Sequence, residues 1–229
     1  MDSPIGAPSL ARSQRSAHDN PVLGALLRDV LVPHDRLDGA LVDTEAVLSA
    51  AFRSILHGAA STIDALSATT GIPRRTARAA IEALAARGRV ARTDDDRVVA
   101  AAGLSLEPAP HMVVLSGVIL HAWCALDAIG IPAALKRDAV VRSTCARCGQ
   151  PIRCVIERGE PRGDCVASVP ARVCSKPREQ FCPRSRFFCR DTHAQEWLAR
   201  DGCGPALVLE PSELAGLGRA VWDWTNPSR

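Results

Sequence analysis

The distribution of cysteine constrains this chain more than any other feature of its sequence. All nine cysteines of the 229 residues lie at or after Cys124, and the first half contains none. No apolar run approaches the roughly twenty residues that a spanning helix needs, and residues 1–20 lack the apolar stretch of a secretory signal. We therefore expect a cytoplasmic protein with no membrane partner. In that reducing compartment cysteines serve more often as metal ligands, catalytic thiols or buried thiols than as disulfides.

This asymmetry predicts separate functional regions along the chain. We expect a disordered tail over residues 1–20, a helical domain over 21–103 and a catalytic domain over 104–229. In the helical domain, apolar residues recur at helical spacing over 22–32, 43–56 and 74–87, and Ser61 is the expected N-cap of a further helix. Residues 89–92 and 97–100 flank an acidic turn and predict a hairpin. This order is typical of a winged helix-turn-helix.

A winged helix can bind DNA or serve as a scaffold. Arg74, Arg75 and Arg78 open the second helix of the motif and could contact phosphates. The acidic tip at Asp94–Asp96, however, would repel a phosphate backbone where the wing should hold it. The formal charge of +3 permits contact with nucleic acid without demanding it. We therefore favour a scaffold role and do not expect a nucleic-acid partner.

The second half predicts an α+β domain with a mixed or antiparallel sheet and short helices. Residues 159–163 should form a surface turn, and Ser212 should cap the last helix. The expected strands are 104–106, 112–115, 118–123, 140–143, 151–156, 165–169, 187–188 and 206–209, and the expected helices are 125–135, 194–199 and 212–224.

Three residues of this half are the candidates for chemistry. Cys124 stands where a strand gives way to a helix, and Asp127 follows three residues later on the same helix face. A sulfur at a helix N-terminus lies by unpaired N–H groups, which favour the thiolate. Cys182 follows much later, and only the fold can bring it to the others. Each residue alone is as well explained as a buried thiol or a helix cap.

The second half resembles the alkylmercury lyases of bacterial mercury resistance. The resemblance rests on Ala122–Asp127, Pro132–Ala133, Ser143–Cys145, Phe181–Cys182 with Phe187–Phe188, Glu196–Trp197 and Gly216–Gly218. It implies that Cys124, Asp127 and Cys182 are catalytic, that the same three residues bind the Hg(II) product, and that Cys145 is structural. The winged-helix pattern of the first half is also what the family carries. Pro183 and His121 depart from the family, which has a second Cys and a Tyr at these positions in many members.

The implied reaction is protonolysis of a carbon–mercury bond, which converts an organomercurial substrate into a hydrocarbon and Hg(II). Thiolates are the soft ligands that a soft ion prefers, and a carboxyl group sheltered from water can carry the proton. No resident cofactor is expected, low-molecular-weight thiols should help product release, and a mercuric reductase should accept the ion. The alternative function is a winged-helix regulator whose cysteine-rich half senses a metal.

The remaining thiols, Cys148, Cys154, Cys165, Cys174, Cys189 and Cys203, fall outside the family pattern. Cys145 and Cys148 resemble one knuckle of a zinc ribbon, but no second Cys-x-x-Cys follows. Cys154, Cys165 or Cys174 could complete an irregular site. The sequence favours unmetallated thiols over structural zinc.

Overall fold

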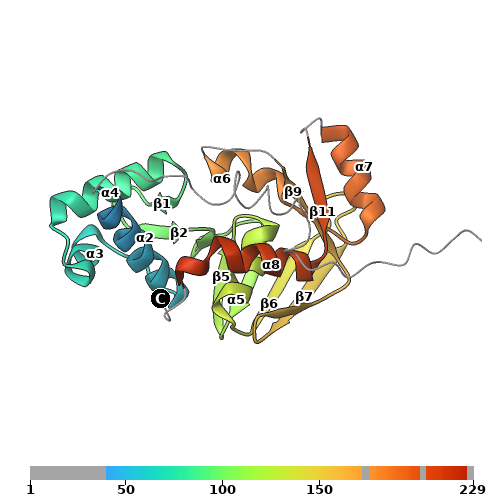
Figure 1. Ribbon diagram of the computed structural model, residues 1–229, viewed down its shortest axis with the longest axis horizontal. Helices are drawn as coiled ribbons and strands as arrows, with labels where there is room; N and C mark the ends of the chain where they lie inside the picture. Colours follow the sequence, from blue (N-terminus) through green and yellow to red (C-terminus); the bar gives the residue numbers. More distant parts are fainter. Residues whose placement is uncertain (1–39, 172–175, 202–204, 226–229) are drawn as a thin grey trace, which may run out of the picture.

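The computed structural model describes residues 40–171, 176–201 and 205–225, and it places three helices at one end of the molecule (Figure 1). These helices are α2 (Ala40–Leu56), α3 (Ile63–Thr70) and α4 (Arg74–Ala86). Thr62, not Ser61, caps α3, because its hydroxyl accepts a hydrogen bond from the Ala65 N–H at 3.1 Å. The backbone of Ser61 is instead paired with Val98. The expected tail and first helix, with Cys174 and Cys203, lie outside the described residues.

An eight-stranded antiparallel sheet follows the helices. Its strand order is β1-β2-β3-β5-β4-β6-β7-β8, so that the predicted hairpin of β1 and β2 is confirmed as one edge of the sheet. Since β2 pairs with β3, the sheet runs without a break past residue 103. The strands are β1 (Val90–Arg92), β2 (Val98–Ala101), β3 (Leu104–Ser105), β4 (His111–Leu115), β5 (Val118–Ala122), β6 (Ala139–Thr144), β7 (Pro151–Glu157) and β8 (Glu160–Arg162). The strand β8 lies where the sequence predicts only a turn.

A three-stranded antiparallel sheet of order β10-β9-β11 completes the second half. It consists of β9 (Val166–Pro170), β10 (Phe187–Phe188) and β11 (Ala206–Leu209). The short helix α6 (Pro177–Gln180) and the 3-10 turn η3 (Cys182–Arg184) precede β10, and helix α7 (Asp191–Asp201) follows it. The chain is therefore an α+β protein dominated by antiparallel strands, as the sequence predicts.

Helix α5 (Ala125–Leu135) lies at the centre of this arrangement. It contacts β4–β7 of the large sheet, β9 of the small sheet and helix α8 (Pro211–Val221). Every residue from Ala125 to Ala133 is buried, which explains why the segment is apolar on all sides rather than amphipathic. Where α5 crosses α8, Gly130 and Gly218 allow the two backbones to touch. A Cβ atom on Gly218 would lie 2.0 Å from the Cα atom of Gly130.

Both ends of α8 are fixed by contacts that differ from what the local sequence predicts. Glu210, not Ser212, caps α8, because Glu210 and Glu213 form a reciprocal capping box around Pro211. After α8, the buried indole of Trp222 donates a hydrogen bond from Nε1 to the carbonyl oxygen of Ala102 at 3.0 Å. The last described residues are thereby fixed to the β2–β3 turn, 120 residues earlier in the chain.

The arginines that could contact DNA are largely engaged with acids of the same region. Arg78 and Arg92 both bind the carboxylate of Asp96, at 2.7 Å each. Arg74 pairs with Asp64. The hydrogen bond from Arg78 is the main cause that lowers the pKa of Asp96. The acidic tip thus neutralises the cations beside it, which weakens the case for phosphate binding.

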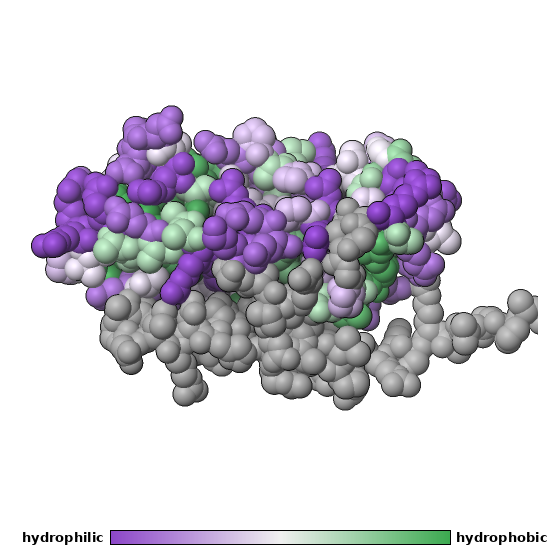
Figure 2. Space-filling model, turned by 90° about the horizontal axis from the view of Figure 1, so that it is seen from above, coloured by the Kyte–Doolittle hydropathy of each residue, from purple (hydrophilic) through white to green (hydrophobic). Residues whose placement is uncertain are grey.

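Among the coloured residues of Figure 2, hydrophilic side chains predominate, and apolar side chains emerge between them in smaller areas. Among the described residues, only Ile119 and Trp224 are large hydrophobic residues with exposed side chains. Within the same residues, no helix is long and apolar enough to cross a membrane.

Candidate active site

Cys124 occupies the junction between β5 and α5. It is the N-cap of α5, with extended backbone angles, and its sulfur accepts a hydrogen bond from the Asp127 N–H at 3.4 Å. The helix begins at Ala125, so that Asp127 lies in its first turn, on the same face as the N-cap residue Cys124. The local geometry that the sequence predicts for Cys124 and Asp127 is therefore confirmed.

Ser185 brings the distant Cys182 to this helix end. Its carbonyl oxygen accepts a hydrogen bond from the Ala125 N–H at 3.0 Å, and its hydroxyl accepts one from the Leu126 N–H at 3.3 Å. These are two of the N–H groups that a helix start leaves without a partner. Ser168 of β9 supports the same loop from behind, since its hydroxyl donates to the Arg184 carbonyl oxygen at 2.6 Å. The loop that begins at Cys182 is thus fixed at the start of α5.

The donor atoms of Cys124, Asp127 and Cys182 all lie within 4.8 Å of one another. The Cys182 thiol donates a weak hydrogen bond to Oδ2 of Asp127 at 3.9 Å. The other oxygen, Oδ1, lies against Gly103, where a Cβ atom would approach it to 2.5 Å. Two sulfurs and a carboxyl group so placed can all contact a single ion.

All three side chains are buried, with exposed fractions of 1% for Cys124 and 6% for both Asp127 and Cys182. Burial, followed by the neighbouring Cys182 thiol, raises the pKa of Cys124 well above its usual range. Burial and the charge of Cys124 also raise the pKa of Asp127. The expectation that the helix N-terminus favours a thiolate at Cys124 is therefore wrong, because the loss of solvent outweighs the helix dipole. The site favours a protonated carboxyl group, which is the form that can donate a proton.

The structure thus brings together the three residues that the sequence singles out, although their roles in catalysis stay a prediction. The sequence analysis missed Ser185 and Gly103, which hold two of them in place. No local pattern marks Ser185. The position of Gly103 between two short strands indicates a turn, but it does not indicate that the Asp127 carboxyl group lies against this turn.

A second cluster of possible metal ligands lies apart from this site. The donor atoms of Cys145, Cys148, Cys189 and His193 also lie within 4.8 Å of one another. Burial raises the pKa of Cys145, but backbone N–H groups of Cys189, Cys148 and Arg147 outweigh it and lower the pKa to about 6. The sequence analysis identified the Cys145–Cys148 pair and missed its partners. The spacing Cys189-x-x-x-His193 is the signal that could have found them.

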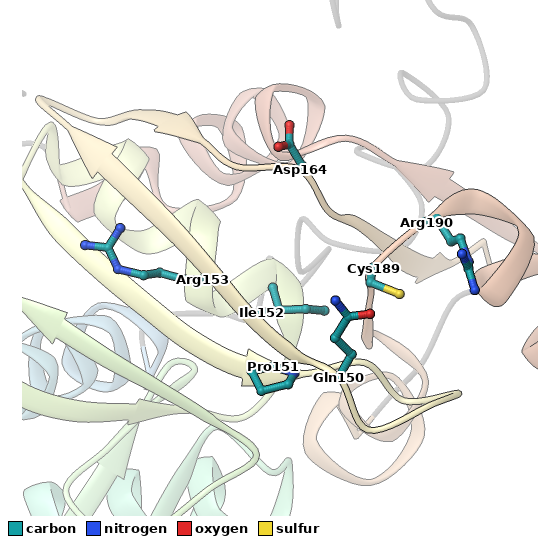
Figure 3. A pocket seen from close by; sticks show the side chains of 7 residues that line it. All are labelled: Gln150, Pro151, Ile152, Arg153, Asp164, Cys189 and Arg190. Carbon is teal, nitrogen blue, oxygen red and sulfur yellow. The ribbon is translucent and has the colours of Figure 1, made fainter.

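A surface hollow of about 440 Å³ borders this second cluster. Figure 3 shows Cys189 and Arg190 beside Gln150, with Asp164 and Arg153 farther along the hollow. Cys124, Asp127 and Cys182 do not line this hollow. Cys154 and Cys165, also buried, form a separate pair in which the Cys165 thiol lowers the pKa of Cys154.

Comparison with known proteins gives one consistent family. The profile of the alkylmercury lyase family matches residues 104–223. Alkylmercury lyases of Bacillus cereus and Clostridium butyricum are each 30% identical over 187 residues, covering 77% of this chain and 84% of the relative. The crystal structure of the mercury-bound form of MerB2 superposes with a TM-score of 0.75 and 25% identity, over 89% of this chain and 96% of that one.

Proposed function

The chain belongs to the alkylmercury lyase family, and we propose that Cys124, Asp127 and Cys182 are the residues that perform its reaction. The observation that carries this assignment is the convergence of two thiols and one carboxyl group, all three buried, with their donor atoms within 4.8 Å of one another. Two soft sulfur ligands for mercury and one carboxyl group that can carry a proton suit the cleavage of a carbon–mercury bond. The substrate is an organomercurial, and the products are a hydrocarbon and Hg(II).

The first part of the reaction is capture of the metal by sulfur. An incoming R–Hg(II)–X displaces the proton of one thiol, and this proton leaves with the ligand X that mercury gives up, because metal binding requires the deprotonated ligand. Mercury is soft, so that thiolate is the protein ligand it prefers. Binding of the second sulfur places more electron density on mercury and weakens its bond to carbon.

The second part is transfer of a proton to carbon. Asp127 begins this step as the carboxylic acid that its raised pKa favours, and the second thiol, as it binds mercury, supplies the proton that replaces the one Asp127 gives up, along the hydrogen bond from Cys182 to Oδ2. The Hg–C bond then breaks, its electron pair remains on carbon, and carbon takes the proton from the carboxylic acid. The raised pKa of Asp127 suits this step, because a carboxyl group in water would release its proton before carbon could accept it. Two thiolates then hold Hg(II).

Product release requires competing sulfur ligands. Low-molecular-weight thiols of a reducing cytoplasm supply them, and a mercuric reductase is the enzyme class that would consume the ion. No resident cofactor takes part in the proposed steps.

The helical region ahead of the sheet is proposed to be a winged-helix-like scaffold. The pairing of Arg74 and Arg78 with Asp64 and Asp96 supports this role over DNA binding. A metal-responsive repressor would retard a promoter fragment with a steep dependence on salt. We expect no such retardation, while hydrocarbon release should proceed without DNA.

The assignment is tested by hydrocarbon release from an organomercurial under excess thiol. Cys124→Ser and Cys182→Ser should each abolish release, since hydroxyl oxygen is a poor ligand for mercury. Asp127→Ala should slow release while leaving organomercurial binding intact. The conservative control is Cys154→Ser, which removes a buried thiol away from the site. Undiminished turnover by Asp127→Ala would remove this residue from the mechanism.

A further inference from the structure

We propose that Cys145, Cys148, Cys189 and His193 bind one zinc ion in a structural site separate from Cys124 and Cys182. The sequence alone favours unmetallated thiols, because only one of the two ligand pairs has the familiar Cys-x-x-Cys spacing. The fold supplies the second pair from a distant segment. This inference does not depend on which residues cleave the substrate.

The donor atoms all lie within 4.8 Å of one another, and two of the three closest distances are near the edges of a tetrahedron around zinc. Zinc–sulfur bonds of about 2.3 Å and zinc–nitrogen bonds of about 2.0 Å place tetrahedral ligands roughly 3.8 Å apart for two sulfurs and roughly 3.5 Å apart for sulfur and nitrogen. The sulfurs of Cys148 and Cys189 are 3.8 Å apart. His193 Nδ1 lies 3.6 Å from the Cys145 sulfur and 3.2 Å from the Cys189 sulfur.

The first ligand pair lies in a tight turn between β6 and β7 that directs both sulfurs to one side. The Cys145 N–H donates to the Gln150 carbonyl oxygen, and the Gly149 N–H donates to the Cys145 carbonyl oxygen, each at 2.8 Å. Gly149 has φ of +75°, a conformation that glycine adopts without strain. Backbone N–H groups of Arg147 and Cys148 also point at the Cys145 sulfur. This turn is already shaped as a metal-binding knuckle.

The second pair lies at the junction of β10 and α7. Cys189 directly follows Phe188, and His193 lies in the first turn of α7. Contacts outside the cluster hold this junction against the knuckle. The Ala146 N–H donates to the Phe187 carbonyl oxygen at 2.9 Å, and Arg147 pairs with Glu196 of α7 at 3.0 Å.

Arg190 is the residue that must adjust when the metal binds. Its guanidinium now donates to Nε2 of His193, at 3.0 Å from Nε and 2.7 Å from Nη2. A metal on Nδ1 leaves the ring proton on Nε2, which can then no longer accept a hydrogen bond. Arg190 borders the surface hollow, so that its side chain has space to turn away (Figure 3). Its charge still favours the site, because three thiolates and Zn(II) carry a net charge of −1.

The donor set identifies both the ion and its role. Three thiolates and one imidazole are a common ligand set of structural zinc. Four protein ligands leave no open position for a substrate, in contrast to the two sulfurs and one carboxyl group beside α5. The ion would join the β6–β7 turn to the segment that starts seven residues after Cys182, and so stabilise the part of the fold that carries Cys182.

The test is the metal content of the full chain, purified under anaerobic reducing conditions and measured by mass spectrometry. We expect about one zinc ion per chain in the wild type and in the Cys124→Ser/Cys182→Ser control. The Cys148→Ser/Cys189→Ser variant should retain none. Cobalt(II) added to zinc-free wild-type protein should give the intense visible absorption of a tetrahedral thiolate site. This second measurement holds even if the double variant fails to fold.

The role of His193 is tested by two substitutions at one position. His193→Cys keeps four ligands and should retain zinc, whereas His193→Ala should weaken zinc binding at least roughly tenfold in competition with a chromophoric chelator. The inference is overturned if wild-type protein lacks zinc and gives only octahedral cobalt absorption. It is equally overturned if zinc disappears with Cys124 and Cys182 and persists without Cys148 and Cys189.

Discussion

Replacing Gly103 by Ala should disable the enzyme through the position of Asp127 rather than through loss of the fold. Gly103 lies in the turn between β2 and β3 with φ of +105°, and its carbonyl oxygen accepts a hydrogen bond from the Trp123 N–H. A Cβ atom here would lie 2.5 Å from Oδ1 and 2.7 Å from Cγ of Asp127. The substitution therefore acts on the carboxyl group of Asp127, which we propose to be catalytic, from a turn that lies 24 residues earlier in the chain.

The size of the effect follows from these distances. An ordinary contact starts at 3.4 Å, so that the carboxyl group and the turn must separate by about 0.9 Å. A displacement near 1 Å of a catalytic group costs turnover roughly 100-fold. The backbone conformation adds a separate cost, because a side chain at positive φ destabilises the fold by about 1–2 kcal/mol.

Gly117→Ala separates the two effects. Gly117 lies in the turn between β4 and β5 with φ of +88°, and a Cβ atom there meets nothing within 4 Å. Both variants should lose similar stability in urea unfolding, but only Gly103→Ala should lose hydrocarbon release. Equal turnover by the two variants would refute the argument that Gly103 positions Asp127.

Three further predictions concern the framework of the site. Gly218→Ala should destabilise the fold by about 3 kcal/mol in urea unfolding, because the added Cβ atom would meet Gly130. Alanine also stabilises a helix relative to glycine by about 1 kcal/mol, and Ala220→Gly at an exposed position of the same helix measures this contribution. Burial lowers the pKa of His111 from 6.5 to about 3. Between pH 6.5 and about pH 3, His111 therefore binds a proton in the unfolded chain but not in the folded protein. Stability should therefore fall as pH drops through this window, by on the order of 5 kcal/mol at most, and a His111→Gln variant unfolded at the same pH values should show a flatter profile. Ser185→Ala should lose about 1 kcal/mol of stability and also slow turnover, whereas unchanged turnover would leave Ser185 with no positioning role.

The sequence predicts those parts of the fold that local chemistry determines. The sequence predicts a strand over 118–123 and a helix over 125–135, and the structure confirms the strand β5 and the helix from Ala125 to Leu135. Helix caps are harder to predict, because Ser61 and Ser212 are favoured N-cap residues that lie close to Thr62 and Glu210, the residues that cap α3 and α8. Thr62 caps α3 because the backbone of Ser61 is paired with Val98 of β2. Glu210 caps α8 because it forms the capping box with Glu213.

The site shows a different limit. Cys124 and Asp127 are related by one helical turn, whereas Cys182 comes from a distant segment that the hydrogen bonds of Ser185 fix at the start of α5. The sign of the Cys124 pKa shift depends on burial, which no local pattern reveals. The resemblance to a family identified all three residues, but Cys189 lies outside the family pattern, and the structure shows that it lies with His193 beside Cys145 and Cys148.

The most direct test of the central claim is the coordination of mercury after one turnover. X-ray absorption by protein that has cleaved one equivalent of organomercurial should show two sulfur neighbours around Hg(II). Cys124→Ser and Cys182→Ser, each loaded with Hg(II), should lose one of them, and Cys148→Ser should lose neither. Two-sulfur coordination that persists without both Cys124 and Cys182, together with continued hydrocarbon release, would contradict the account.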